Sequence, residues 1–123
     1  MGDYLMSLIK ANDIQNASGG IPTVKSQRLI PTAWVNFNGS GTVAINDDEG
    51  VSSITDSGTG NYSVNLSNTM SDTNYCAASS NNDWNATAAA YPESTSKVKV
   101  YVENNNSLSD TSVIGVIVMG GQA

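Results

Sequence analysis

The sequence lacks histidine entirely and contains a single cysteine, Cys76, among its 123 residues. Without histidine the chain has no ordinary general base for neutral pH, which excludes Ser-His-Asp and Cys-His catalytic arrangements. One cysteine can neither close an intrachain disulfide nor complete a zinc site built from His and Cys ligands. We expect Cys76 to point into a packed strand as a small hydrophobic residue.

Charge is also scarce, because only 13% of the residues are charged, about half of the ~25% that is usual. Five basic residues stand against eleven acidic ones, which gives a net charge of -6. A nucleic-acid partner needs positive charge to displace counterions. No basic amphipathic segment, signal-peptide pattern or run of about 18 apolar residues is present. We therefore expect no nucleic-acid partner and no membrane insertion.

The carboxylates give little indication of catalysis or metal binding, because we expect them in turns or at strand ends. A catalytic pair is not favoured there. The segment 46–50 (Asn-Asp-Asp-Glu-Gly) offers oxygen ligands but lacks the alternating spacing of a calcium loop, and it predicts an acidic hairpin turn. We expect no enzyme activity, no catalytic residue, no metal and no cofactor. The acids considered are Asp47, Asp48, Glu49, Asp56, Asp72 and Asp83.

Apolar and polar residues alternate through much of the chain after residue 32. Val35 and Phe37 alternate with Asn36 and Asn38, and Gly-rich segments separate such runs. A period of two with this punctuation is typical of antiparallel strands that are buried on one face. We predict an all-β antiparallel sandwich of about seven strands. The predicted strands are 33–38, 42–46, 51–56, 61–66, 74–79, 97–103 and 112–119; segment 84–91 fits either a short strand or one helical turn.

The first 31 residues differ from the rest, since they sustain no period and hold three of the five basic residues. We predict an N-terminal arm over 1–31, with a short ordered piece at 5–14 and a turn or linker at 18–22, followed by the sandwich domain over 32–123. The arm would attach the protein to another chain; the alternatives are a disordered leader and an extra edge strand. The attachment candidates are Leu5, Leu8, Ile9, Lys10 and Ile14.

The last predicted strand, 112–119, is apolar on both faces over residues 113–119, and such a strand must be covered on both sides. A sandwich covers only its inner face, so we expect the outer side to meet another copy of the chain. Burying three such side chains would contribute about 5 kcal/mol. The alternative is a central strand covered by the arm or by loops. The interface candidates are Val113, Ile114, Val116, Ile117 and Val118.

The aromatic residues Trp84 and Tyr91 lie near polar residues in the sequence and could bind a sugar through stacking and hydrogen bonds. The weak ligand-binding candidates are Asn81, Asn82, Asp83, Trp84 and Tyr91. The alternative is that Trp84 caps the core and Tyr91 packs under the loop. Trp34, within a strand pattern, is expected to be structural.

Three segments carry a resemblance to a known type of module: 33–39 (AWVNFNG), 51–56 (VSSITD) and 60–65 (GNYSVN). Together they resemble a β module that recurs in bacteriophage tail-fibre and other virion-surface proteins. The module would cover about three quarters of the chain, from Ala33 onward. Where it often has a basic or uncharged turn, this chain has the acidic segment 47–50. The resemblance implies a place on the outside of a phage particle and a homotrimer.

The functional expectation is a non-enzymatic virion structural protein. One version is a short tail fibre or fibre tip, attached by its arm and contacting a host-surface glycan. A second is a capsid decoration protein that stabilises the head together with other virion proteins. A third, from another class, is a stand-alone carbohydrate-binding module, which would be monomeric.

Overall fold

The computed structural model describes residues 10–19 and 30–121 of the chain. The chain divides into two units, Met1–Ile30 and Pro31–Ala123. In the first unit, all of residues 10–19 are exposed. A turn ends this stretch: the Gly19 amide donates to the Asn16 carbonyl at 2.9 Å, and the Ser18 amide donates to the Asn16 side chain at 2.9 Å. The predicted ordered piece at 5–14 falls outside the described residues over 5–9, and its described part forms no helix or strand.

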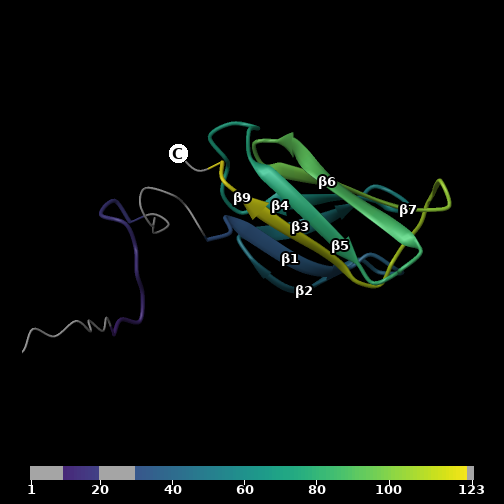
Figure 1. The fold of residues 1–123 in the computed structure, drawn as a ribbon, viewed down its shortest axis with the longest axis horizontal. Coiled ribbons are helices and arrows are strands. Elements are labelled where there is room, and N and C mark those ends of the chain that lie inside the picture. The colour runs from purple at the N-terminus through teal and green to yellow at the C-terminus, as the bar shows by residue number, and fades with distance from the viewer. Residues whose placement is uncertain (1–9, 20–29, 122–123) are drawn as a thin grey trace, which may run out of the picture. The chain divides into compact units, whose positions relative to one another are not determined.

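The second unit is an all-β sandwich of two antiparallel sheets, which confirms the predicted fold class (Figure 1). The described residues form nine strands rather than the seven expected. The strands are β1 (Ala33–Asn38), β2 (Ala44–Glu49), β3 (Val51–Asp56), β4 (Asn61–Leu66), β5 (Cys76–Asn81), β6 (Ala86–Ser94), β7 (Lys97–Asn104), β8 (Ser107–Leu108) and β9 (Ile114–Met119).

The two sheets draw on segments that are distant in the sequence. One has the order β2-β1-β9-β5 and is called here the four-stranded sheet; the other has the order β3-β4-β7-β6, with β8 pairing to β7, and is called the five-stranded sheet. Figure 1 shows β5, β9, β1 and β2 side by side in front of the other sheet. The chain therefore changes sheet four times: between β2 and β3, between β4 and β5, between β5 and β6, and between β8 and β9.

The alternating pattern places one side of each sheet in a shared core. Val35 and Phe37 of β1 are buried, as are Val98, Val100 and Val102 of β7. The ring of Phe37 meets that of Tyr62 on β4 edge-on, with centroids 5.4 Å apart at an angle of 72°. This pair of rings bridges the two sheets at the centre of the core.

A polar contact closes one end of the core around the buried Tyr62. Its hydroxyl lies 2.6 Å from the Gly39 carbonyl and 2.7 Å from Asp110 Oδ1. The Gly60 amide donates to the same carboxylate oxygen at 2.8 Å. A Cβ at Gly39 would come within 2.7 Å of that hydroxyl and within 2.6 Å of Ile114. Residue 39 is glycine because the chain passes this close to the tyrosine.

One local prediction is wrong, and another is settled in favour of a strand. The segment 46–50 is no hairpin turn, because β2 runs through Glu49 and pairs with β1, not with β3. Gly50, with φ at 73°, carries the chain from one sheet to the other. Of the two alternatives for segment 84–91 the strand is confirmed, since residues 86–91 form most of β6, which at nine residues is longer than expected. Its run of alanines places Ala88 and Ala90 opposite Val102 and Val100, where small side chains pack beneath the facing sheet.

Candidate functional site

The final strand β9 does not offer five interface residues. Ile114, Val116 and Val118 are 0–1% exposed and pack inside the sandwich, so they cannot meet another subunit. Val113 precedes β9 and is partly buried, whereas Ile117 points outward and is 51% exposed. The interface prediction is reduced to the outer side of this strand, and the earlier figure of about 5 kcal/mol for three buried side chains no longer applies.

The outer side of β9 does form the floor of an apolar groove of about 470 Å³. Ile117 lies opposite Trp34 of β1 on one side and Ala78 of β5 on the other. In the neighbouring row, Gly115 lies between Asn36 and Ser80. Gly115 has no side chain, but that of Ser80 leans over it, with the hydroxyl oxygen 2.6 Å from where a Cβ would stand. None of the described residues that line the groove is a lysine, an arginine or an acid.

Trp34 is therefore a wall of this groove as well as part of a strand. Its position could have been found in the sequence, because it shares the face of Asn36 and not that of Val35 and Phe37. The size of the groove could not, since it depends on Gly115 and Ala78 reaching neighbouring positions from distant segments.

The loop between β5 and β6 was predicted to bind a ligand, but its polar side chains hold the loop itself. Asn81 donates to the Ala86 carbonyl at 3.2 Å and accepts from the Asp83 amide at 2.8 Å. Asn82 donates to Ser112 at 2.9 Å and accepts from the Val113 amide at 3.1 Å. Both carboxylate oxygens of Asp83 also accept hydrogen bonds, from the Asn85 amide and the Asn104 side chain.

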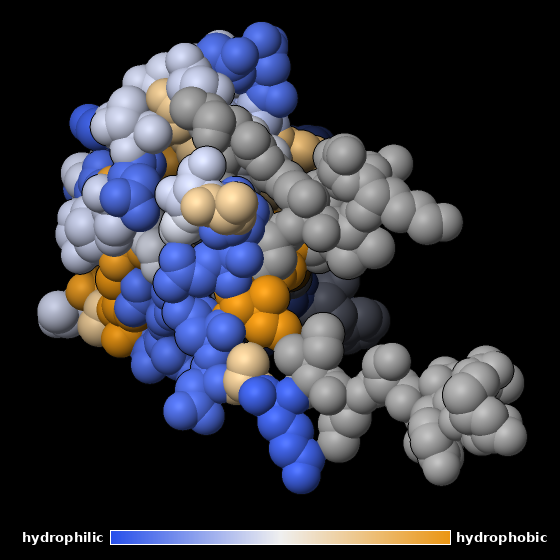
Figure 2. Space-filling model, turned by 90° about the vertical axis from the view of Figure 1, so that its left-hand side faces the viewer, coloured by the Kyte–Doolittle hydropathy of each residue, from blue (hydrophilic) through white to orange (hydrophobic). Residues whose placement is uncertain are grey.

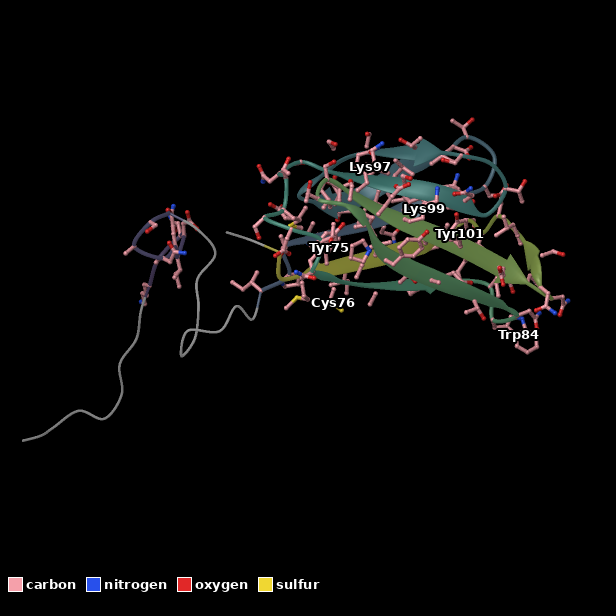
Figure 3. The ribbon with its side chains drawn as sticks, turned by 90° about the horizontal axis from the view of Figure 1, so that it is seen from above. Tyr75, Cys76, Trp84, Lys97, Lys99 and Tyr101 are labelled. Atoms are coloured by element: carbon pink, nitrogen blue, oxygen red, sulfur yellow. The ribbon has the colours of Figure 1, made fainter. Side chains whose placement is uncertain are left out.

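Trp84 at the tip of that loop is 92% exposed, so it does not cap the core. The structure does not bring it together with Tyr91. Tyr91 lies five residues beyond Ala86 on β6, which at about 3.3 Å per residue is roughly 17 Å along the strand. Figure 3 shows Trp84 at the opposite end of the sandwich from Tyr75 and Cys76. Sugar binding by Trp84 stays a prediction.

Tyr91 instead belongs to the outer face of the five-stranded sheet. Its ring stacks on that of Tyr101 from β7, with centroids 6.3 Å apart at an angle of 26°. Tyr91 remains 46% exposed. Sequence reasoning missed this pair, although the alternation of Val98, Val100 and Val102 already placed Tyr101 on the opposite face of β7.

Cys76 is exposed at the start of β5, which corrects the prediction that it is buried. Its neighbour Ala77 packs against the core instead. Cys76 faces outward because its neighbours Tyr75 and Ala77 take the inward positions of the alternation.

The attachment candidates of the N-terminal segment are only partly visible. Leu5, Leu8 and Ile9 lie outside the described residues. Lys10 is exposed, and Ile14 is 61% exposed. An exposed isoleucine suits the predicted attachment role, which stays a prediction.

Residues 10–19 and 30–121 contain no group of three His, Cys, Asp or Glu side chains placed to hold a metal ion. Over the same residues, no helix has the length and apolar character that crossing a bilayer requires. Viewed end-on, the described surface is mostly hydrophilic, with hydrophobic side chains emerging in a few places (Figure 2).

Comparison with known proteins found no match: no protein-family model matches the chain, and neither a curated protein nor a solved structure matches it.

Proposed function

We propose that the chain is a non-enzymatic structural protein of a bacteriophage virion, a surface appendage of the short tail-fibre or fibre-tip type. In this proposal the N-terminal segment attaches it to other virion proteins, and copies associate, as a homotrimer, through the apolar groove of the four-stranded sheet. The sandwich then faces the host surface.

The observation that carries the virion proposal is the resemblance of three segments to a virion-surface β module. These segments fold as β1, β3 and β4, so they supply strands to both sheets. Their apolar positions Val35, Phe37, Tyr62 and Val64 are buried in the common core. The resemblance thus extends over residues that determine how the sheets pack, and not over an isolated surface motif.

The groove supports the association part of the proposal. Ile117 projects from the floor of the groove and is 51% exposed, so in an assembly Ile117 of one copy would enter the groove of the next. Burying the exposed half of Ile117 would contribute about 1 kcal/mol, and Trp34 adds a large ring whose burial dominates many interfaces. The described residues that line the groove carry no charge, which matters because like charges would repel when copies of a chain with net charge -6 meet.

The proposal is tested on purified particles of the phage that encodes the chain. Quantitative mass spectrometry should find its peptides in density-purified virions, and antibody against the sandwich should label the tail in electron micrographs. Label on the head would favour the capsid-decoration alternative. Absence of the peptides from purified virions would contradict both.

A further inference from the structure

The outer face of the five-stranded sheet combines an open aromatic surface with fixed polar groups. Tyr91 and Tyr101 lie on neighbouring strands with nearly parallel rings, and Tyr91 presents 46% of its surface to solvent. Side chains at diagonal positions on adjacent strands reach one another in this way. Stacking on Tyr101 fixes the ring of Tyr91, whose exposed part is an apolar surface on a face whose other residues are mostly polar.

A buried lysine stem ends beside this surface. Lys99 is only 8% exposed, and its Nζ lies 5.4 Å from the centre of the Tyr101 ring. Within the described part of the chain the Nζ of Lys99 has no ion-pair or hydrogen-bond partner, and it is not fully buried. The stem is therefore held in place while the ammonium group reaches solvent, with its hydrogen-bond donors open to a ligand.

An acceptor is fixed on the same face. Ser63, 5% exposed, donates from its hydroxyl to Glu93 Oε2 at 2.9 Å. Ser63 lies opposite Lys99, and Lys99 lies opposite Tyr91, so this bond draws the Glu93 carboxylate across β7. Figure 3 shows Lys97, Lys99 and Tyr101 following one another along that strand. Donor, acceptor and aromatic surface occupy adjoining positions.

The charge of this face differs from that of the rest of the sandwich. Residues 31–123 contain two basic and nine acidic residues, a formal charge of -7. Both basic residues, Lys97 and Lys99, lie on this face and are balanced by Glu93 and Glu103. The face is locally neutral in an acidic domain, which disfavours anionic ligands such as nucleic acid or uronic acids.

We propose that this face, formed by Tyr91, Tyr101, Lys99 and Glu93, binds a neutral saccharide. A sugar ring has apolar C–H faces that stack on aromatic rings, and hydroxyls that both donate and accept hydrogen bonds. The ammonium and the carboxylate satisfy both functions with charge-assisted bonds. The site is distinct from the loop of Trp84, and it goes beyond the proposed function because it requires neither self-association nor a virion.

The test probes the full chain with an array of immobilised oligosaccharides terminating in neutral hexoses, N-acetylhexosamines or uronic acids. Binding to neutral members is expected, and the best of these is then titrated in solution. Tyr91→Ala should weaken its binding about tenfold, whereas Tyr91→Phe, which keeps the ring, should bind like the wild type. Lys99→Met, which keeps the buried stem, should also weaken binding.

Lys97→Met is the matched control, since it removes the same charge from the same face of the same strand but farther from Tyr101, and it should bind normally. Binding to no array member, or to uronic acids alone, would overturn the inference. So would wild-type affinity in both Tyr91→Ala and Lys99→Met, or a loss that appears in Trp84→Ala instead. The solution mass of each variant should equal that of the wild type, so a failure of the association proposal is seen separately.

Discussion

Removing the hydroxyl of Tyr62 should destabilise the sandwich. The hydroxyl has one hydrogen, which is shared between the Gly39 carbonyl at 2.6 Å and Asp110 Oδ1 at 2.7 Å. In Tyr62→Phe the carbonyl of the buried Gly39 loses this bond, which costs about 1–3 kcal/mol. Asp110 is exposed and keeps the Gly60 amide, so water limits its share of the loss.

The expected decrease in the free energy of unfolding is therefore about 2–3 kcal/mol. The ring contact with Phe37 survives the substitution, so no cavity contributes. Urea unfolding followed by tryptophan fluorescence should show a midpoint lower by about 1–2 M with an unchanged slope. Tyr91→Phe removes the same atom from an exposed ring and should leave the midpoint unchanged. Equal midpoints for the two variants would refute the assignment of this contact as a closure of the core.

Three further predictions follow from named positions. Burial, together with the hydrogen bond to Asp110, raises the pKa of Tyr62 well above its ordinary value. The contribution of Tyr62 to stability is therefore complete below about pH 10 and is lost as the pH rises further. The free energies of unfolding measured at pH 8 and at pH 11 should accordingly differ less in Tyr62→Phe than in the wild type. Val116→Ala should lower the unfolding free energy by about 2 kcal/mol because it empties core space, whereas Ile117→Ala should change it by less than about 0.5 kcal/mol in dilute solution; a larger loss at Ile117 would contradict the assignment of the two faces of β9. Cys76, being exposed, should react with a thiol reagent in the native protein as fast as in urea, and protection in dilute native protein would contradict its placement.

The sequence predicted the parts of the fold that rest on strict alternation. The strands 33–38, 51–56 and 61–66 have the predicted bounds, because apolar residues at every second position fix which face of each strand is buried. The long strand β6 was harder to predict, since alanine is no strong strand former. Its pairing was not visible either, because Ala90 lies opposite Val100, which is ten residues away in the sequence.

The surfaces were harder to predict than the strands. Asn81 and Asp83 were predicted to bind a ligand, but their side chains accept hydrogen bonds from amides of their own loop. A sequence does not show which polar side chains already have hydrogen-bond partners. The stacking of Tyr91 on Tyr101 depends on the register of β6 and β7, which the bulge between Pro92 and Ser94 shifts. Ile117 was among five interface candidates because both faces of β9 are apolar; only the topology shows which three of them the second sheet covers.

The solution mass of the full chain, measured by light scattering over a range of concentrations, tests the central claim most directly. We expect three copies for the wild type. Ile117→Asp should dissociate them, because it places a charge in the groove, while Thr87→Asp, which adds the same charge to an exposed position of the other sheet, should not. A wild-type mass of one chain at every concentration would contradict association through the outer face of the four-stranded sheet.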